Sequence, residues 1–152
     1  MSLGIADVFD SLISHAKQLG IFDRVNQHEP TNAPGNGLTA AIWSQTIGPA
    51  AGASGLASTT VRVEFWVRVY LPALQQPQDG IDIAIIDAVD QLMAAYSGDF
   101  DLDDTVRNVD LLGQFGTPLS ARAGYLNQDG RQFRTMDIVL PVIINDAWEQ
   151  TA

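Results

Sequence analysis

The chain has 152 residues, with 18 acidic and 8 basic side chains and no cysteine, which suits one compact domain without disulfides, thiol nucleophiles or Cys-ligated zinc. Its net charge of −10 opposes binding to nucleic-acid phosphates and to anionic membranes. No apolar run approaches the ~18 to 20 residues that span a bilayer, and the start MSLGIADVFD lacks the basic region of a signal peptide, so we expect a protein that is made in the cytoplasm.

The first predicted elements are a helix, a short strand and a loop. Residues 2–20 carry apolar side chains at three- and four-residue spacing, with Ser2 able to cap the start and Gly20 to stop the helix. Residues 22–27 favour a short strand. The segment 29–37, EPTNAPGNG, is dense in Pro, Asn and Gly and predicts a flexible loop.

Two strands then enclose a segment of small residues. Residues 38–47, LTAAIWSQTI, predict a strand in which Ala41 and Trp43 pack. Residues 48–58 are almost wholly Gly, Ala and Ser and predict a second flexible loop. The strand 59–72 is longer than the usual ~5 to 6 residues, so we expect it in the middle of the sheet.

The strand 59–72 alternates between two files of side chains, which lie on opposite faces of a sheet. One file is apolar and predicts the core face: Val61, Val63, Phe65, Val67, Val69 and Leu71. The outer file is mixed and comprises Thr60, Arg62, Glu64, Trp66, Arg68 and Tyr70. Because interface cores are enriched in aromatic residues and Arg, the outer file either contacts a partner or forms a second face under a helix of the same chain.

Residues 78–96 predict the second helix. Its main apolar stripe comprises Ile81, Ile85, Ala88, Val89, Leu92 and Tyr96 and predicts packing on the sheet. Ile86 and Met93 lie on an adjoining flank of the same helix. This flank is a candidate contact for the outer file of a neighbouring subunit.

Three strands and a short tail complete the sequence, at residues 106–112, 119–126, 132–144 and 147–152. Asp129-Gly130, between the last two strands, predicts a tight hairpin. The order of elements predicts one α+β domain over 1–152, whose mostly antiparallel sheet carries both main helices on one face.

The histidines give little support to a catalytic or zinc site. His15 falls at helical spacing from Leu12 and Leu19, and His28 follows the first short strand. Neither belongs to an HExxH or paired-ligand pattern, and the sequence has no nucleophile elbow and no phosphate-binding glycine loop. We therefore expect no enzyme, no cofactor and no metal.

The acidic run SGDFDLDD allows one alternative. Asp99, Asp101 and Asp103 match the first ligands of a calcium loop, but Asp104 stands where that loop needs glycine. Phe100 and the following leucine alternate with the acids as in a strand. We favour a solvated strand start over a calcium site.

A resemblance to a known family follows from the order of segments along residues 3–146. A first helix ending LGIFDRV precedes the strands AAIWSQ and VRVEFWVRVYLP, the helix DAVDQLMAAYSGDF, then VDLLG and the hairpin GYLNQDGRQFRTMDIVLPVIIND. In this pattern the chain resembles the tail terminator proteins of long-tailed bacteriophages, also called tail completion or minor tail proteins.

The resemblance implies a structural virion protein with no reaction and no cofactor. Such proteins form a ring, expected to be a hexamer, that caps the tail tube, ends its polymerisation and offers the docking surface for the head. The implied partners are further copies of the chain, the tail tube protein and a head–tail connector, at the tail–neck junction. DNA passes through the channel without specific binding, which like charge favours.

Two alternatives remain beside this reading of the sequence. One is another neck protein, such as a head closure or joining component. The other, from a different class, is a small acidic calcium-binding or hydrolase domain.

Overall fold

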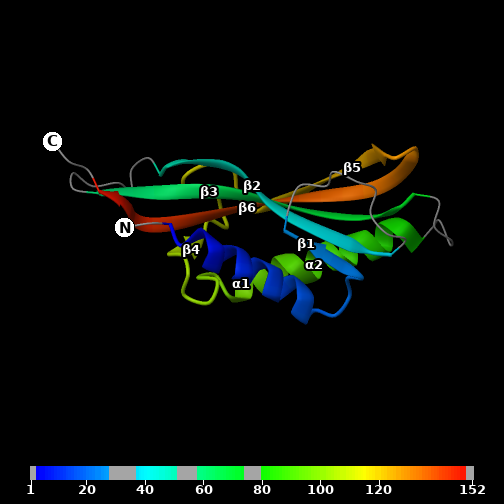
Figure 1. The fold of residues 1–152 in the computed structure, drawn as a ribbon, viewed down its shortest axis with the longest axis horizontal. Helices are drawn as coiled ribbons and strands as arrows, with labels where there is room; N and C mark the ends of the chain where they lie inside the picture. The colour runs from blue at the N-terminus through cyan, green and yellow to red at the C-terminus, as the bar shows by residue number, and fades with distance from the viewer. Residues whose placement is uncertain (1–2, 28–36, 51–57, 74–79, 150–152) are drawn as a thin grey trace.

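The computed structural model describes residues 3–27, 37–50, 58–73 and 80–149 as a twisted sheet with two helices on one of its faces (Figure 1). The elements in chain order are α1 (Ile5–Gln18), β1 (Arg24–Asn26), β2 (Thr39–Pro49), β3 (Ser58–Pro72), α2 (Ile81–Gly98), β4 (Asn108–Val109), β5 (Ser120–Gln128) and β6 (Arg131–Glu149). The predicted α+β class, with a mostly antiparallel sheet and both helices on one face, is confirmed.

The sheet is built around β3. Its order is β1-β2-β3-β6-β4, and β5 also pairs with β6. β3 runs antiparallel to β2 on one edge and to β6 on the other, whereas β1 and β2 are parallel. The predicted position of this strand in the middle of the sheet is confirmed.

The core lies between the sheet and the helices. Every member of the apolar file of β3 is buried, as is the predicted stripe of α2. The rings of Phe9 in α1 and Phe65 in β3 meet edge to face, with their centroids 5.1 Å apart. The period-two and helical patterns of the sequence therefore identified the two surfaces that form the core.

The first helix is shorter than predicted. Gly4 is its N-cap, so the helix begins three residues after Ser2, which lies outside the described residues. Gly20 adopts a left-handed backbone with φ of 68° and its amide donates to Lys17 O, as expected for a glycine after a helix end. No helix in the described part of the chain has the length and apolar character to cross a membrane.

Two strands extend further than the sequence predicted. β2 continues through Gly48 and Pro49, which pair with Arg62 and Val61, so the loop predicted at 48–58 starts too early. β6 continues to Glu149, so the tail predicted at 147–152 is wrong for its first three residues. Residues 28–36 and 51–57, most of both predicted flexible loops, lie outside the described part of the chain, as do 150–152.

The strand predicted at 106–112 is almost absent, because β4 has two residues, paired with Ile143 and Val142 of β6. The next prediction, a tight hairpin, is confirmed. Asp129 and Gly130 both have positive φ, 53° and 75°, between strands that pair from end to end.

The acidic run forms a turn and not the predicted strand start. Leu102, Asp103 and Asp104 have φ of 48°, 58° and 63°, a left-handed conformation that non-glycine residues rarely adopt in succession. Leu102 is fully buried, whereas Phe100 is 54% exposed. The alternation of acids and apolar residues therefore reflects a turn that inserts one leucine into the core.

We expect alkaline pH to lower the stability of the fold through Tyr96, which links the two helices. Its buried hydroxyl donates to Leu12 O at 3.0 Å, and burial raises the pKa of Tyr96. Above pH ~10 the unfolded chain loses this proton and the folded chain keeps it, so the free energy of unfolding falls, by about 1.4 kcal/mol at pH 11. Urea unfolding between pH 8 and 11 measures this dependence.

Tyr96→Phe should flatten the pH dependence, whereas Tyr125→Phe, which changes a side chain 64% exposed, should not. An identical pH dependence in Tyr96→Phe and the wild type would contradict the assignment to Tyr96.

Candidate functional site

The outer file of β3 lies on the sheet face away from the helices. Directly paired residues share a face, and the outer file is paired with Asp137, Val139 and Ile143 of β6 through Arg68, Trp66 and Arg62. Figure 1 shows α1 and α2 on the opposite face. Within the described residues no helix covers the outer file, so the alternative of a second face buried under a helix is not what the structure has.

Arg62 is held by groups of its own chain. Its guanidinium donates to Glu64 Oε2 at 2.9 Å, to Asp110 Oδ2 at 3.5 Å and to Thr117 O. Only 10% of the Arg62 side chain and 4% of the Asp110 side chain are exposed. Removal of Arg62 would leave the Asp110 carboxylate buried without its cation.

The loop between β4 and β5 closes over Arg62 because Asp110 organises it. The two carboxylate oxygens of Asp110 accept from the amides of Gln114, at 2.8 Å, and Phe115, at 3.0 Å. The same carboxylate therefore fixes the loop and neutralises Arg62. This loop, and not a helix or a partner, covers the first part of the outer file.

The other end of the outer file is also satisfied within the chain. Arg68 donates to both carboxylate oxygens of Asp137, at 2.7 and 3.2 Å, and lies over the ring of Trp43. Tyr70 is 1% exposed and meets Phe133 edge to face. Tyr70 thus belongs to a second apolar cluster on this face with Ala41, Trp43 and Phe133, against which Trp66 also packs. Arg68 lies beside this cluster, and both Arg68 and Tyr70 offer little surface to another molecule.

Trp66, in the middle of the outer file, is the residue left open. It is half-buried and borders a cavity of about 380 Å³, together with Arg122, Asp137, Val139 and neighbouring residues of β5. Its indole nitrogen is buried and has no hydrogen-bond partner among the described residues. An aromatic side chain beside an open cavity and the exposed Arg122 has the composition typical of an interface core.

The predicted helix flank lies on the other side of the sheet. Ile86 is 55% exposed and joins Ile83, 71% exposed, one turn earlier on α2. Met93 is half-buried and packs against the core. One chain cannot bring these residues to the outer file, so a contact between the two surfaces would require two chains.

Two important partners were absent from the sequence analysis. Asp110 and Asp137 neutralise the arginines of β3 but lie 48 and 69 residues further along the chain. The period-two pattern of the last strand places Asp137 on the same face as Arg68, which was a usable signal. Asp110 gave no such signal in the sequence, because it lies just after a strand of two residues, which is too short to show a period-two pattern.

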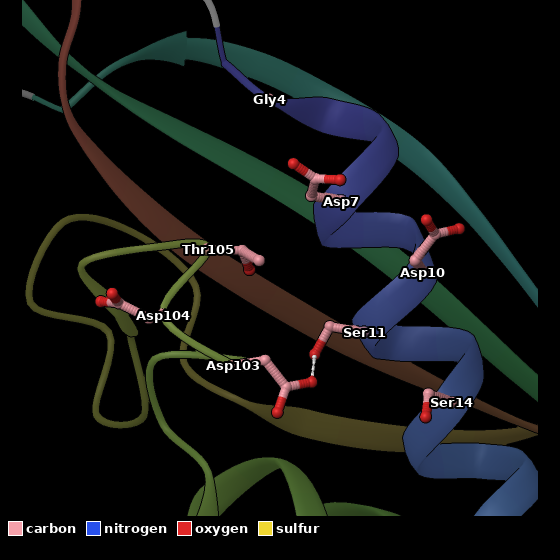
Figure 2. Close-up of a pocket in the computed structure, with 8 residues that line it drawn as sticks. All are labelled: Gly4, Asp7, Asp10, Ser11, Ser14, Asp103, Asp104 and Thr105. Carbon is pink, nitrogen blue, oxygen red and sulfur yellow. Dashed lines mark hydrogen bonds between the residues drawn. The ribbon is translucent and has the colours of Figure 1, made fainter.

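An acidic cavity of about 660 Å³ lies between α1 and the left-handed turn (Figure 2). Its lining residues are Gly4, Asp7, Asp10, Ser11, Ser14, Asp103, Asp104 and Thr105. The Ser11 hydroxyl donates to Asp103 Oδ2 at 2.8 Å across the cavity. The calcium pattern of the sequence is only partly reproduced, since the metal-ligating atoms that converge beside this cavity belong to His15, Asp99 and Asp103, without Asp101.

Comparison with known proteins gives distant structural likenesses. No protein-family model and no curated protein matches the sequence. The fold is similar to the PVC sheath/tube terminator of an extracellular contractile injection system in its extended state, with a TM-score of 0.41, 13% identity and coverage of 97% of this chain and 58% of that chain. It is also similar to a chain in the virion of a native gene transfer agent, with a TM-score of 0.36, 15% identity and coverage of 94% and 92%.

This chain spans 58% of the length of the injection-system terminator. At these TM-scores neither structure assigns a residue role to this chain.

Arg62→Met should destabilise the fold, because it leaves the buried Asp110 without its cation. We expect a loss of about 3 kcal/mol in the free energy of unfolding, measured by urea titration. Arg122→Met, which removes an equal charge from an exposed position on the same face, should change it by less than about 0.5 kcal/mol. Equal effects of the two substitutions would show that the Arg62 cluster contributes little.

Proposed function

We propose that this chain is a tail terminator-like structural protein of a phage-like particle, a subunit of a ring that caps the tail tube. The observation that carries the proposal is that the sheet, among the strands that the structure describes, has two open edges of different sequence. The resemblance of the chain to tail terminators supports the same function.

The first open edge is the second half of β2. β1 pairs with β2 only from Thr39 to Ala41, and no other described strand lies along the far edge of β2. Most residues from Ser44 to Pro49 are exposed, including Ile47 at 56%. These residues present unpaired backbone groups beside an apolar side chain.

The second open edge is β5. Its register with β6 runs from Ser120 to Gln128, and among the described strands it has no other partner. Tyr125 on this strand is 64% exposed. In Figure 1 the β5–β6 hairpin reaches one end of the molecule, away from β4 and the start of α1.

Unpaired strand edges are templates for pairing with another chain. When the two edges differ, the contact between copies is heterologous, and such contacts form a ring when the rotation between subunits closes and an open filament when it does not. In the proposed ring, β2 of one subunit pairs with β5 of the next, which continues the sheet from subunit to subunit. The expectation of six subunits follows from the resemblance to tail terminators and not from the pairing of the strand edges.

The ring would act at the tail–neck junction of the virion. It would end tube polymerisation, bind the tail tube protein on one side and provide the docking surface for a head–tail connector on the other. The net charge of −10 suits a channel through which DNA slides without binding. None of these roles requires an enzymatic site.

Edge pairing and the predicted contact of the outer file with the helix flank are alternative ring geometries. Continuation of the sheet places the outer face of one subunit beside the outer face of the next, so Trp66 does not reach Ile86 and Met93 of the neighbour. In that geometry the Trp66 cavity faces the tube, the connector or the channel.

Ile47→Lys should abolish ring formation and leave the monomer folded, because an edge lysine opposes strand pairing. Electron microscopy and native mass spectrometry, at high protein concentration and with purified tail tubes, measure the ring. Ile86→Lys and Trp66→Ala are the matched controls and should both keep it. If these two variants lose the ring while Ile47→Lys still forms it, the result would favour the contact between the outer file and the helix flank.

A monomer at every concentration that also fails to bind tail tubes would contradict the proposed function. A ring that binds the head–tail connector but not the tube would identify another neck protein instead.

A further inference from the structure

The imidazole of His15 has a fixed orientation. Its Nδ1 lies 2.7 Å from Ser11 O one turn earlier on α1, and because a carbonyl only accepts, Nδ1 carries a proton. The ring stacks on Tyr96 of α2 and is 12% exposed. Metal-binding histidines are commonly oriented in this way, by a hydrogen bond from one ring nitrogen to a backbone carbonyl.

The other ring nitrogen faces two carboxylates of the left-handed turn. His15 Nε2 lies 2.8 Å from Asp99 Oδ2, and one oxygen of Asp103 completes a group whose atoms all lie within 4.8 Å of one another. The turn places Asp103 there because the amide of Asp103 donates to Asp99 Oδ2 at 3.0 Å. Elements more than 80 residues apart thus supply one nitrogen and two oxygens.

The surroundings favour a cation. Asp7, Asp10 and Asp104 line the adjacent cavity of about 660 Å³, as Figure 2 shows, and no basic side chain is among its lining residues. The cavity is large enough for water molecules to complete a coordination shell. The concentration of acidic groups raises the local concentration of cations.

We infer that His15, Asp99 and Asp103 bind a divalent transition metal such as Zn²⁺. Calcium and magnesium prefer oxygen ligands, whereas an imidazole with carboxylates suits zinc. Zinc binds Nε2 in its deprotonated form, and the exposed Asp103 moves inward to reach bonding distances near ~2.1 Å. The metal then joins α1 to the turn that follows α2.

From the sequence we predicted no metal, since neither histidine belongs to a paired-ligand pattern. The proposed site also differs from the calcium loop considered there. His15 replaces Asp101, whose carboxylate accepts from the amide of Asp104 at 3.3 Å.

The test is a titration of the apoprotein with Zn²⁺ by calorimetry, together with thermal melting. We expect one ion per chain and a melting temperature that rises by about 5 to 10 °C at a Zn²⁺ concentration a hundred times the Kd. Asp103→Asn should weaken binding at least tenfold while it keeps a residue that tolerates the left-handed backbone. His15→Gln should do the same.

Asp104→Asn and Asp101→Asn are the matched controls. Each removes one charge from the same turn and leaves the three proposed ligands in place, so each should keep the Zn²⁺ Kd within about threefold. An equal loss in Asp104→Asn and Asp103→Asn would mean that cations respond only to the total charge, which overturns the site.

Three other results would also overturn the proposal. They are no Zn²⁺ binding by the wild type, unchanged binding in Asp103→Asn, and tighter binding of Ca²⁺ that Asp101→Asn abolishes. Asp103→Asn keeps the test decisive if His15→Gln fails to fold.

Discussion

The pairing of β3 on both edges is the constraint on which the rest of the structure depends. A strand paired on both edges lies inside the sheet, and here the helices cover one of its faces while the loop after β4 and the second apolar cluster cover much of the other, so its charged residues need partners within the chain. Arg62 forms an ion pair with Asp110, and Arg68 forms one with Asp137. These ion pairs fix the loop after β4 and the side-chain register of β6, while the apolar file on the other face fixes the helices.

Local periodicity predicted the elements whose residues repeat one pattern. β3, the stripe of α2 and the Asp129-Gly130 hairpin could all be identified, because each depends on neighbours in the sequence. The end of β6 could not, since Asn145 and Asp146 interrupt its pattern and Asp146 even has positive φ. β6 continues because Ser58 and Thr59 of β3 pair with its last residues. The length of β6 is therefore set by its partner strand and not by its own sequence.

The candidate site shows the same division between local and distant information. A polar file on a strand has the same sequence whether it faces a partner molecule or a loop of its own chain. The sequence selected Arg62, Arg68 and Trp66 as equals, yet the structure satisfies the two arginines internally and leaves Trp66 beside a cavity. Long-range pairing decided which residues stay available, and a single sequence carries little of that information.

The acidic run has a structural reason that does not involve a cation. A left-handed residue costs roughly 1 to 2 kcal/mol, which Asp tolerates better than most residues do. Burial of Leu102, worth about 1.5 to 3 kcal/mol, and hydrogen bonds from the turn amides to Asp99 and Asp101 offset part of this cost for the three left-handed residues Leu102, Asp103 and Asp104. The acidic side chains are thus used by the turn itself, and the feature that points to a metal is the imidazole of His15.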